Sequence, residues 1–211
     1  MGRAPRGIGS LGAGSRVTSR AKRLPTILPP EKDRPMLSRY RSSYRIRAAR
    51  RQDLHLLPAI ERAAASRFSG HGLARTYASL AMTAEQFEGR QHAGRLWIAA
   101  DPRDRPVGFA TWSILDGLVH LDELDVVPRH GRRGVGSDLV RAAFGWARQR
   151  SRPGITLSTT DGVEWNVPFY SRQGFRVLPE RAYTEGLRRL RQAEAAAGLP
   201  PALRLIMHRS V

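Results

Sequence analysis

The segment from Leu124 to Leu139 constrains the fold more than any other part of this 211-residue chain. An apolar strand pattern ends at Pro128, glycines and basic residues follow, and a helix-spaced apolar face begins at Val135. The first amides of a helix lack intrahelical partners and point outward at the positive end of the helix dipole. This order of strand, loop and helix start therefore predicts an anion site, in which glycines allow close approach and the N–H donors come from Gly134, Val135, Gly136 and Ser137.

Two other phosphate-binding patterns are excluded by their spacing. Gly131, Gly134 and Gly136 do not form the G-x-G-x-x-G of dinucleotide sites, and no G-K-[ST] follows for a nucleoside triphosphate. A glycine turn that only reverses the chain is the remaining alternative. The basic residues in the loop, including Arg132 and Arg133, exceed what such a turn needs.

Composition excludes several kinds of chemistry. The chain has no cysteine, so disulfides, thiolate zinc sites and cysteine nucleophiles are ruled out, and we expect no metal centre. No run of roughly 18 apolar residues and no apolar leader is present, which predicts a soluble, cytoplasmic protein without a membrane partner. The 36 basic residues against 18 acidic ones favour phosphate-bearing partners, nucleic acid included.

The chain divides at about residue 43. Residues 1–43 are rich in Gly, Pro, Ser and Arg, with ten basic residues against two acids, and we expect a disordered basic extension. One interpretation is a dispensable tail, or a start codon assigned too early, with Met36 as the alternative start. The others are a targeting segment and an arm that binds nucleic acid. Residues 44–211 form the predicted folded domain.

Periodicity within residues 44–211 predicts the order β-α-α-β-β-β-α-β-α-β-α-β. Strands are predicted at 44–47, 96–100, 107–114, 118–127, 155–159, 175–178 and 203–207. Helices are predicted near 54–64, 83–92, 134–149, 166–172 and 184–197. Tight turns join the three central strands into an antiparallel meander. The order implies a single α/β (α+β) domain with a mixed, mostly antiparallel sheet covered by helices on both faces.

Two motifs resemble those of the GNAT superfamily of N-acetyltransferases. The loop is similar to the acetyl-coenzyme A motif [RQ]-x-x-G-x-[GA] after a V-x-P strand end, except that Gly131 stands at the usual Arg or Gln. We expect Arg132 or Arg133 to supply that charge. About 30 residues later, Asn166 to Phe175 resembles the family's second motif in the form N-x-x-F-Y-x-x-x-G-F. The resemblance covers residues 44–211 and implies acetyl-CoA as co-substrate.

Acetyl transfer to an amine needs a base, a donor that polarises the carbonyl and a proton for the leaving thiolate. Strand alternation predicts His120 and Asp122 on one face and Glu123 on the other. The resemblance implies that the base lies at Asp122, with His120 as partner or substitute, while Glu123 holds a structural hydrogen bond or the acceptor amine. Which of the three is the base stays open. So does the alternative that all three belong only to a solvated surface of the sheet. Asp125 is interpreted as a surface or loop-anchoring residue.

The resemblance assigns the remaining roles as well. A backbone amide at Val126 or Val127 would polarise the thioester carbonyl, and Asn166 would bond the pantetheine amides. Tyr170 would protonate the leaving thiolate. The alternative is that Tyr170 is only an aromatic residue of the core. The acceptor pocket is expected at about 66–82, where the residues include Phe68, His71, Tyr77 and Met82.

The leading functional hypothesis is direct transfer from acetyl-CoA to a primary amine of a small molecule or peptide, because no cysteine can carry the acetyl group. Two alternatives stay open: a basic nucleic-acid-binding protein, and a regulatory domain that binds acyl-CoA without turnover. The identity of the amine and a homodimeric state are open too.

Overall fold

The computed structural model describes residues 43–211, so the predicted extension lies, apart from Ser43, outside the described residues. The strands are β1 (Arg45–Ala48), β2 (Leu96–Ala100), β3 (Pro106–Leu115), β4 (Leu118–Val126), β5 (Gly154–Thr160), β6 (Arg176–Val177) and β7 (Arg204–Ser210). The helices are α1 (Leu57–Ala65), α2 (Ala74–Ser79), α3 (Ala84–His92), α4 (Val135–Gln149), α5 (Asn166–Arg172) and α6 (Glu185–Ala196). The predicted order is confirmed, with α2 as an addition.

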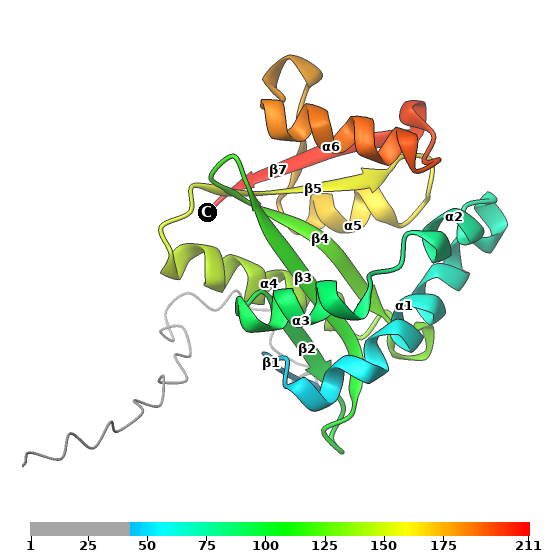
Figure 1. The fold of residues 1–211 in the computed structure, drawn as a ribbon, viewed down its shortest axis with the longest axis vertical. Coiled ribbons are helices and arrows are strands. Elements are labelled where there is room, and N and C mark those ends of the chain that lie inside the picture. The colour runs from blue at the N-terminus through cyan, green and yellow to red at the C-terminus, as the bar shows by residue number, and fades with distance from the viewer. Residues whose placement is uncertain (1–42) are drawn as a thin grey trace, which may run out of the picture. The chain divides into compact units, whose positions relative to one another are not determined.

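The strands form one seven-stranded sheet in the order β1-β2-β3-β4-β5-β7-β6 (Figure 1). All neighbours pair antiparallel except β4 and β5, which pair parallel. The predicted mixed, mostly antiparallel sheet is therefore confirmed. Within residues 43–211, none of the helices combines the length and apolar character that a membrane crossing requires.

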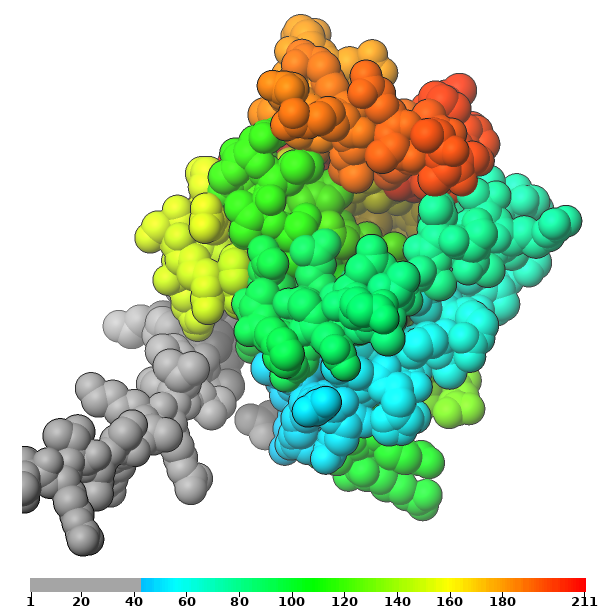
Figure 2. Space-filling model, in the orientation of Figure 1, coloured from blue at the N-terminus to red at the C-terminus, as the bar shows by residue number. Residues whose placement is uncertain are grey.

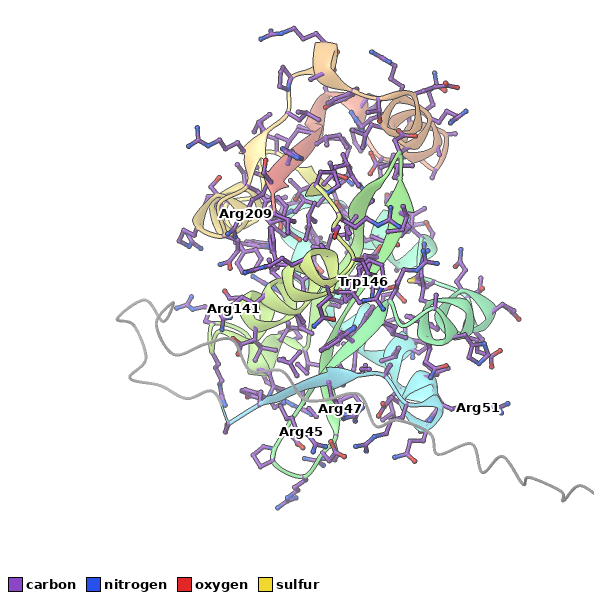
Figure 3. All side chains as sticks on the ribbon, turned by 90° about the vertical axis from the view of Figure 1, so that its left-hand side faces the viewer. Arg45, Arg47, Arg51, Arg141, Trp146 and Arg209 are labelled. Carbon is purple, nitrogen blue, oxygen red and sulfur yellow. The ribbon has the colours of Figure 1, made fainter. Side chains whose placement is uncertain are left out.

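Helices cover both faces of the sheet. The apolar face of α4 packs against β2, β3 and β4 through Val135, Leu139, Ala143 and Trp146, as its periodicity predicts. Burial of each large side chain there contributes about 1.5–3 kcal/mol. Figure 3 shows α4 in front of the sheet, with Trp146 on the helix and Arg45 and Arg47 on β1. On the opposite face, α1 and α3 cover Ile98 and Phe109, and α6 covers Ile206.

The sheet opens between β4 and β5. These strands pair only where residues 119–121 of β4 meet residues 155–157 of β5. Beyond Leu121 the two strands separate, while β5 stays paired with β7 as far as Thr160 (Figure 1). In the part of the chain that the structure describes, the end of β4 therefore has an edge without a strand partner, directly before the glycine-rich loop.

A β-bulge in β4 changes which side chains share a face. Thr111 pairs with Glu123 but Trp112 pairs with Leu121, so Asp122 is the extra residue. Because paired residues lie on the same face, Glu123 lies on the face of Thr111, as do Asp122 and His120. The expectation that Glu123 points to the opposite face is wrong, since the bulge interrupts the alternation on which it depended.

Candidate active site

Two adjoining cavities meet at the opening between β4 and β5. The first, termed the large cavity, has a volume of about 650 Å3 and extends along the loop and the N-terminus of α4. The second, termed the acidic cavity, has a volume of about 130 Å3 and lies beside α1, α2 and β7. Their shared walls are Phe68, Leu124, Asp125, Asn166 and Tyr170. Figure 2 shows the surface hollowed between α2 and α6.

The start of α4 lines the large cavity with four residues that the sequence predicts, Gly134, Val135, Gly136 and Ser137. Gly134 is the N-cap with φ +81°, a conformation that glycine adopts without a steric cost. The first intrahelical bond runs from the N–H of Asp138 to the carbonyl of Gly134, so the preceding amides have no helical acceptor. A Cβ at Gly136 would lie 3.2 Å from Phe169, so glycine allows α4 and α5 to approach closely.

The two loop arginines occupy different places. Arg132 lines the large cavity, with the backbone in the left-handed region at φ +58°. Arg133 does not line it, and its guanidinium donates instead to the hydroxyl of Tyr44 over 3.3 Å. Arg67, which no motif singled out, also lines the large cavity, and its pKa is lowered by burial and by the nearby charge of Arg132. Two guanidinium groups thus face one space, which favours an anion there.

Val126 and Val127 are not equivalent. The Val127 N–H donates to the carbonyl of Val107 over 2.9 Å, and its side chain packs in the cluster that contains Phe109. Of the two predicted alternatives, the Val127 amide is therefore excluded as the donor to the thioester carbonyl, because it is bonded within the sheet. In an antiparallel pair, N–H groups alternate in direction, so the amides of Val126 and Leu124 point away from β3 and toward the opening.

His120 is buried and lies apart from both cavities. Its side chain is 4% exposed, lines neither cavity and shares a 2.9 Å hydrogen bond between Nδ1 and the Thr156 hydroxyl. Burial lowers the pKa of His120 to about 4, so the imidazole is neutral at physiological pH. The expectation that His120 faces the reacting groups is therefore corrected, because its ring is buried against Thr156 and lines neither cavity.

Asp122 lines the acidic cavity but is held by two partners. The Ser113 hydroxyl donates to its Oδ1 over 2.8 Å, and Arg90 of α3 forms a 2.8 Å ion pair with its Oδ2. Burial nevertheless raises the pKa of Asp122 to about 6, against the effects of Arg90 and Ser113.

Glu123 and Asp125 have no such partners. No hydrogen bond or ion pair joins either carboxyl to another residue of the described chain, and Oδ2 of Asp125 is fully buried. Burial raises the pKa of Glu123, and the charges of Asp125, Glu61 and Asp122 raise it further. Burial and Glu61 likewise raise the pKa of Asp125. The interpretation of Asp125 as a surface or loop anchor is wrong, because it lines both cavities.

Tyr170 and Asn166 stand where the cavities meet. Asn166 is the first residue of α5, and Tyr170 follows one turn later on the same side of that helix. Burial raises the pKa of Tyr170, and the nearby carboxyls of Glu123 and Asp125 raise it further, which keeps the phenol protonated. The structure thus brings Tyr170 and Asn166 of the second motif to the acidic cavity, which Glu123 of β4 also lines.

Sequence reasoning missed part of the acidic cavity. Glu61 on α1 is 6% exposed and accepts the Met82 N–H over 3.0 Å. Arg204 on β7 lines the same cavity and binds Glu194 and the hydroxyls of Ser158 and Tyr77. Neither residue lies in a motif, and both come close to β4 only through folding. Of the predicted acceptor residues, Phe68 and Tyr77 line the acidic cavity, whereas His71 and Met82 do not.

Comparison with curated proteins identifies relatives over part of their length. The chain is 30% identical over 82 residues to the uncharacterized N-acetyltransferase YjcF of Bacillus subtilis. It is 38% identical over 82 residues to the peptidyl-lysine N-acetyltransferase YjaB of Escherichia coli. These matches cover 39% of this chain and 56% and 50% of the relatives, so the chain spans about half the length of the curated relatives it matches.

Solved structures share the fold. The PaiA N-acetyltransferase of Thermoplasma acidophilum, crystallised with coenzyme A, has a TM-score of 0.62 at 15% identity over 80% of this chain and 99% of that one. A GCN5-related N-acetyltransferase of Rhodopseudomonas palustris has a TM-score of 0.57 at 21% identity, over 81% of this chain and 97% of that one. The family model described as Acetyltransferase (GNAT) family matches residues 58–175, more than half of the chain. The strand opening, the glycine-rich start of α4 and this match agree: the chain belongs to the GNAT acetyltransferase family.

Proposed function

We propose that the protein is an N-acetyltransferase that transfers an acetyl group from acetyl-CoA directly to a primary amine of a small molecule or peptide. The observation that carries this proposal is the meeting of the two cavities at the β4–β5 opening. One side offers helix amides and arginines to an anionic co-substrate, and the other offers carboxylates to a cationic acceptor. Membership of the GNAT family supports the same reaction.

The residues of the large cavity fit an acyl carrier with phosphate groups. The amides of Val135, Gly136 and Ser137, together with Arg132 and Arg67, would hold the phosphates. Asn166 and the free edge of β4 would hold the amide-containing arm. Acetyl-CoA bound there supplies an activated acetyl group, and the Val126 N–H is the donor that would polarise its carbonyl.

Glu123 is the base that the geometry favours. An alkylammonium has a pKa of about 10, so the acceptor nitrogen must lose a proton before it attacks the acetyl carbon. Asp122 already binds Arg90 and Ser113, whereas the Glu123 carboxyl has no partner in the described chain. Glu123 accepts that proton, directly or through water. Asp122, the first choice from the sequence, is the second candidate.

Tyr170 completes the proposed reaction. As the new C–N bond forms and the C–S bond breaks, the Tyr170 hydroxyl donates a proton to the departing sulfur. Its raised pKa keeps that proton available at neutral pH. Since the chain contains no cysteine, no thiol of the protein can carry the acetyl group between the two substrates.

The test combines calorimetry with thiol release. Acetyl-CoA is titrated into the folded protein, and free thiol and acetylated product are then followed with diamines, aminoglycosides and peptides. We expect binding and turnover with at least one amine. Binding without product across the panel would favour the regulatory domain, and no heat on titration would contradict the coenzyme site.

A further inference from the structure

The side of the sheet that α4 covers is unusually poor in acidic residues. From the end of β4 to the end of β5, the sequence contains seven arginines but one acidic residue, Asp138. The arginines of β1 are instead neutralised, since Arg45 and Arg47 both bind Asp104. Composition gives the chain many arginines, but it does not explain why the acidic residues are missing from this one side.

Three arginines surround Phe144 of α4. The guanidinium of Arg209, on β7, stacks on the Phe144 ring with its Cζ 4.2 Å from the ring centroid. Arg141 precedes Phe144 by three residues and Arg148 follows it by four, so both are its neighbours on the same side of the helix. All three arginines are exposed, and Figure 3 shows Arg141 and Arg209 on the side of the molecule that carries α4. We term Arg141, Arg148 and Arg209 the arginine cluster.

Most of the charge of the arginine cluster is not neutralised. Arg141 forms an ion pair with Asp138, but neither Arg148 nor Arg209 forms one within residues 43–211. Arg209 donates to the carbonyl of Gln173 over 2.5 Å, which positions its side chain and leaves its charge in place. Like charges held close together repel each other, so this arrangement favours a bound anion.

A cavity adjoins the arginine cluster at Arg209. It has a volume of about 220 Å3, and its polar lining consists of Arg176, His208, Arg209 and Ser210, without an acidic residue. At about 30 Å3 for each water molecule of liquid, this volume corresponds to about seven waters, which is enough for one phosphate group with its hydration. Guanidinium and hydroxyl groups are the donors that phosphate oxygens accept.

The positive groups form a row that suits a chain of phosphates. Arg141 and Arg148 are two helical turns apart, about 10.5 Å along α4, and Arg209 continues the row into the cavity. A planar guanidinium can bind a phosphate through two hydrogen bonds. Phe144 is buried beneath Arg209, and no aromatic residue lines the cavity, so neither offers a ring on which a base could stack. The row therefore suits a backbone of phosphates rather than bases.

We propose that the arginine cluster and the adjoining cavity form a nucleic-acid-binding surface, which holds the sugar–phosphate backbone without reading the bases. The surface is separate from the proposed coenzyme site, because none of the three arginines lines the large cavity. It is an additional property of the domain and does not depend on the proposed acetyl transfer.

The first experiment measures binding of a labelled single-stranded DNA of about 20 nucleotides to the full chain by fluorescence anisotropy. Because contacts to phosphates release counterions, we expect the logarithm of the association constant to fall linearly with the logarithm of the salt concentration. Saturating coenzyme A should change the Kd by less than about twofold. Displacement of the DNA by coenzyme A would place it in the large cavity and overturn the proposal. Failure of coenzyme A to bind would contradict the proposed function but not this surface.

A pair of double variants then locates the contacts. Each phosphate contact on a single strand contributes about 0.7 to the salt slope, so Arg148→Gln with Arg209→Gln should lower the slope by about 1.4. Its Kd at about 0.1 M salt should rise about tenfold or more. The matched control is Arg62→Gln with Arg188→Gln, which removes two exposed, unpaired arginines from α1 and α6 on the opposite face. Its Kd should stay within about twofold. Equal losses in both double variants would show binding by net charge alone and overturn the proposal.

Two further measurements test the fold and the class of partner. Arg209 packs on Phe144, so Arg148→Gln alone provides a variant that leaves this packing intact and should lower the slope by about 0.7. Thermal melting confirms that each variant is folded, and an unchanged slope in folded Arg148→Gln would contradict the assignment. Vesicles of phosphatidylglycerol serve as the alternative polyanion. Tighter binding to the vesicles than to DNA, lost in the same double variant, would assign the surface to a membrane and overturn the proposal.

Discussion

Tyr170 lines both cavities, between the predicted sites of the acyl carrier and the amine. General acid catalysis contributes about 10²–10⁴-fold to a rate, so Tyr170→Phe should lower kcat by about 10²-fold or more. The Kd for acetyl-CoA should change by less than about twofold, because the ring remains in place. Stopped-flow thiol release and calorimetry measure the two quantities separately.

Tyr183→Phe is the matched control for that prediction. The Tyr183 hydroxyl accepts the Ile206 N–H over 3.3 Å beneath α6, and Tyr183 lines neither cavity. Its loss should lower the free energy of unfolding by about 1 kcal/mol and leave kcat unchanged. An equal loss of kcat in both variants would remove Tyr170 from the proton-donor role.

The unpaired carboxyl of Asp125 makes stability depend on pH. Its raised pKa means that the folded protein holds a proton that the unfolded chain releases above about pH 4. This group therefore stabilises the folded state at low pH, and that contribution is lost as the pH rises through the raised pKa. Asparagine stays neutral, so Asp125→Asn should gain stability over the unmodified protein as the pH rises.

Urea unfolding of both proteins at about pH 5 and about pH 8 measures that gain. We expect the free energy of unfolding of Asp125→Asn, relative to the unmodified protein, to rise by about 1 kcal/mol or more from the lower to the higher pH. His120 titrates with the opposite sign, because burial lowers its pKa to about 4. Its effect cancels in the difference, since both proteins contain it. A difference that is constant with pH would contradict the burial of an ionisable Asp125.

At the scale of the element, the N-terminus of α4 can be tested with a pair of substitutions at Gly134. Asparagine and aspartate have similar shapes and similar tolerance of the positive φ at this N-cap. Aspartate adds a charge that stabilises the helix dipole but repels a phosphate. We expect Gly134→Asp to raise the Kd for acetyl-CoA about tenfold or more above Gly134→Asn, with equal or higher thermal stability. Equal affinities in calorimetry would exclude an anion at these amides.

The elements that the sequence predicts well are those with local signals. The face of α4 and the run of β2, β3 and β4 follow from periodicity within single segments. Helix α2 has no such signal, since Tyr77 is held by ring stacking on Phe68 and by bonds to Thr160 and Arg204. Those partners lie far away in the sequence, and only the folded chain brings them to α2.

The bulge at Asp122 and the opening beside Leu121 were not predictable for a related reason. Each depends on the register between β4 and a neighbouring strand, which the residues of β4 do not encode alone. A strict alternation therefore placed Glu123 on the wrong face. The polar residues of β4 could be predicted as a functional set, but their division into partnered and unpartnered groups required Thr156, Arg90 and Ser113.

At the scale of the whole molecule, the distribution of charge matters more than its sum. The chain has a formal net charge of +18, yet the amine side of the proposed site is lined by carboxylates. The basic groups on the other side, Arg67 and Arg132, face the large cavity. In the proposed reaction, this separation would draw an anionic co-substrate and a cationic acceptor to opposite sides of one opening, which uniform basicity could not do.

The dispensability of residues 1–43 is the prediction that belongs to this scale. Within residues 43–211, the buried clusters extend from Tyr44 to β7, and Tyr44 itself bonds to His130 at the loop over 2.7 Å. A protein that begins at Tyr44 should therefore melt cooperatively, within about 2 °C of the full chain, since a change of 1 kcal/mol shifts the midpoint by about 2–4 °C at this size. Its kcat/KM should stay within about twofold of the value for the full chain.

Removal of ten basic residues should also weaken binding to DNA or RNA and lower the salt dependence of that binding. Scanning calorimetry, the thiol-release assay and a salt titration check these outcomes, and a truncated chain that does not fold would show that the extension is part of the domain.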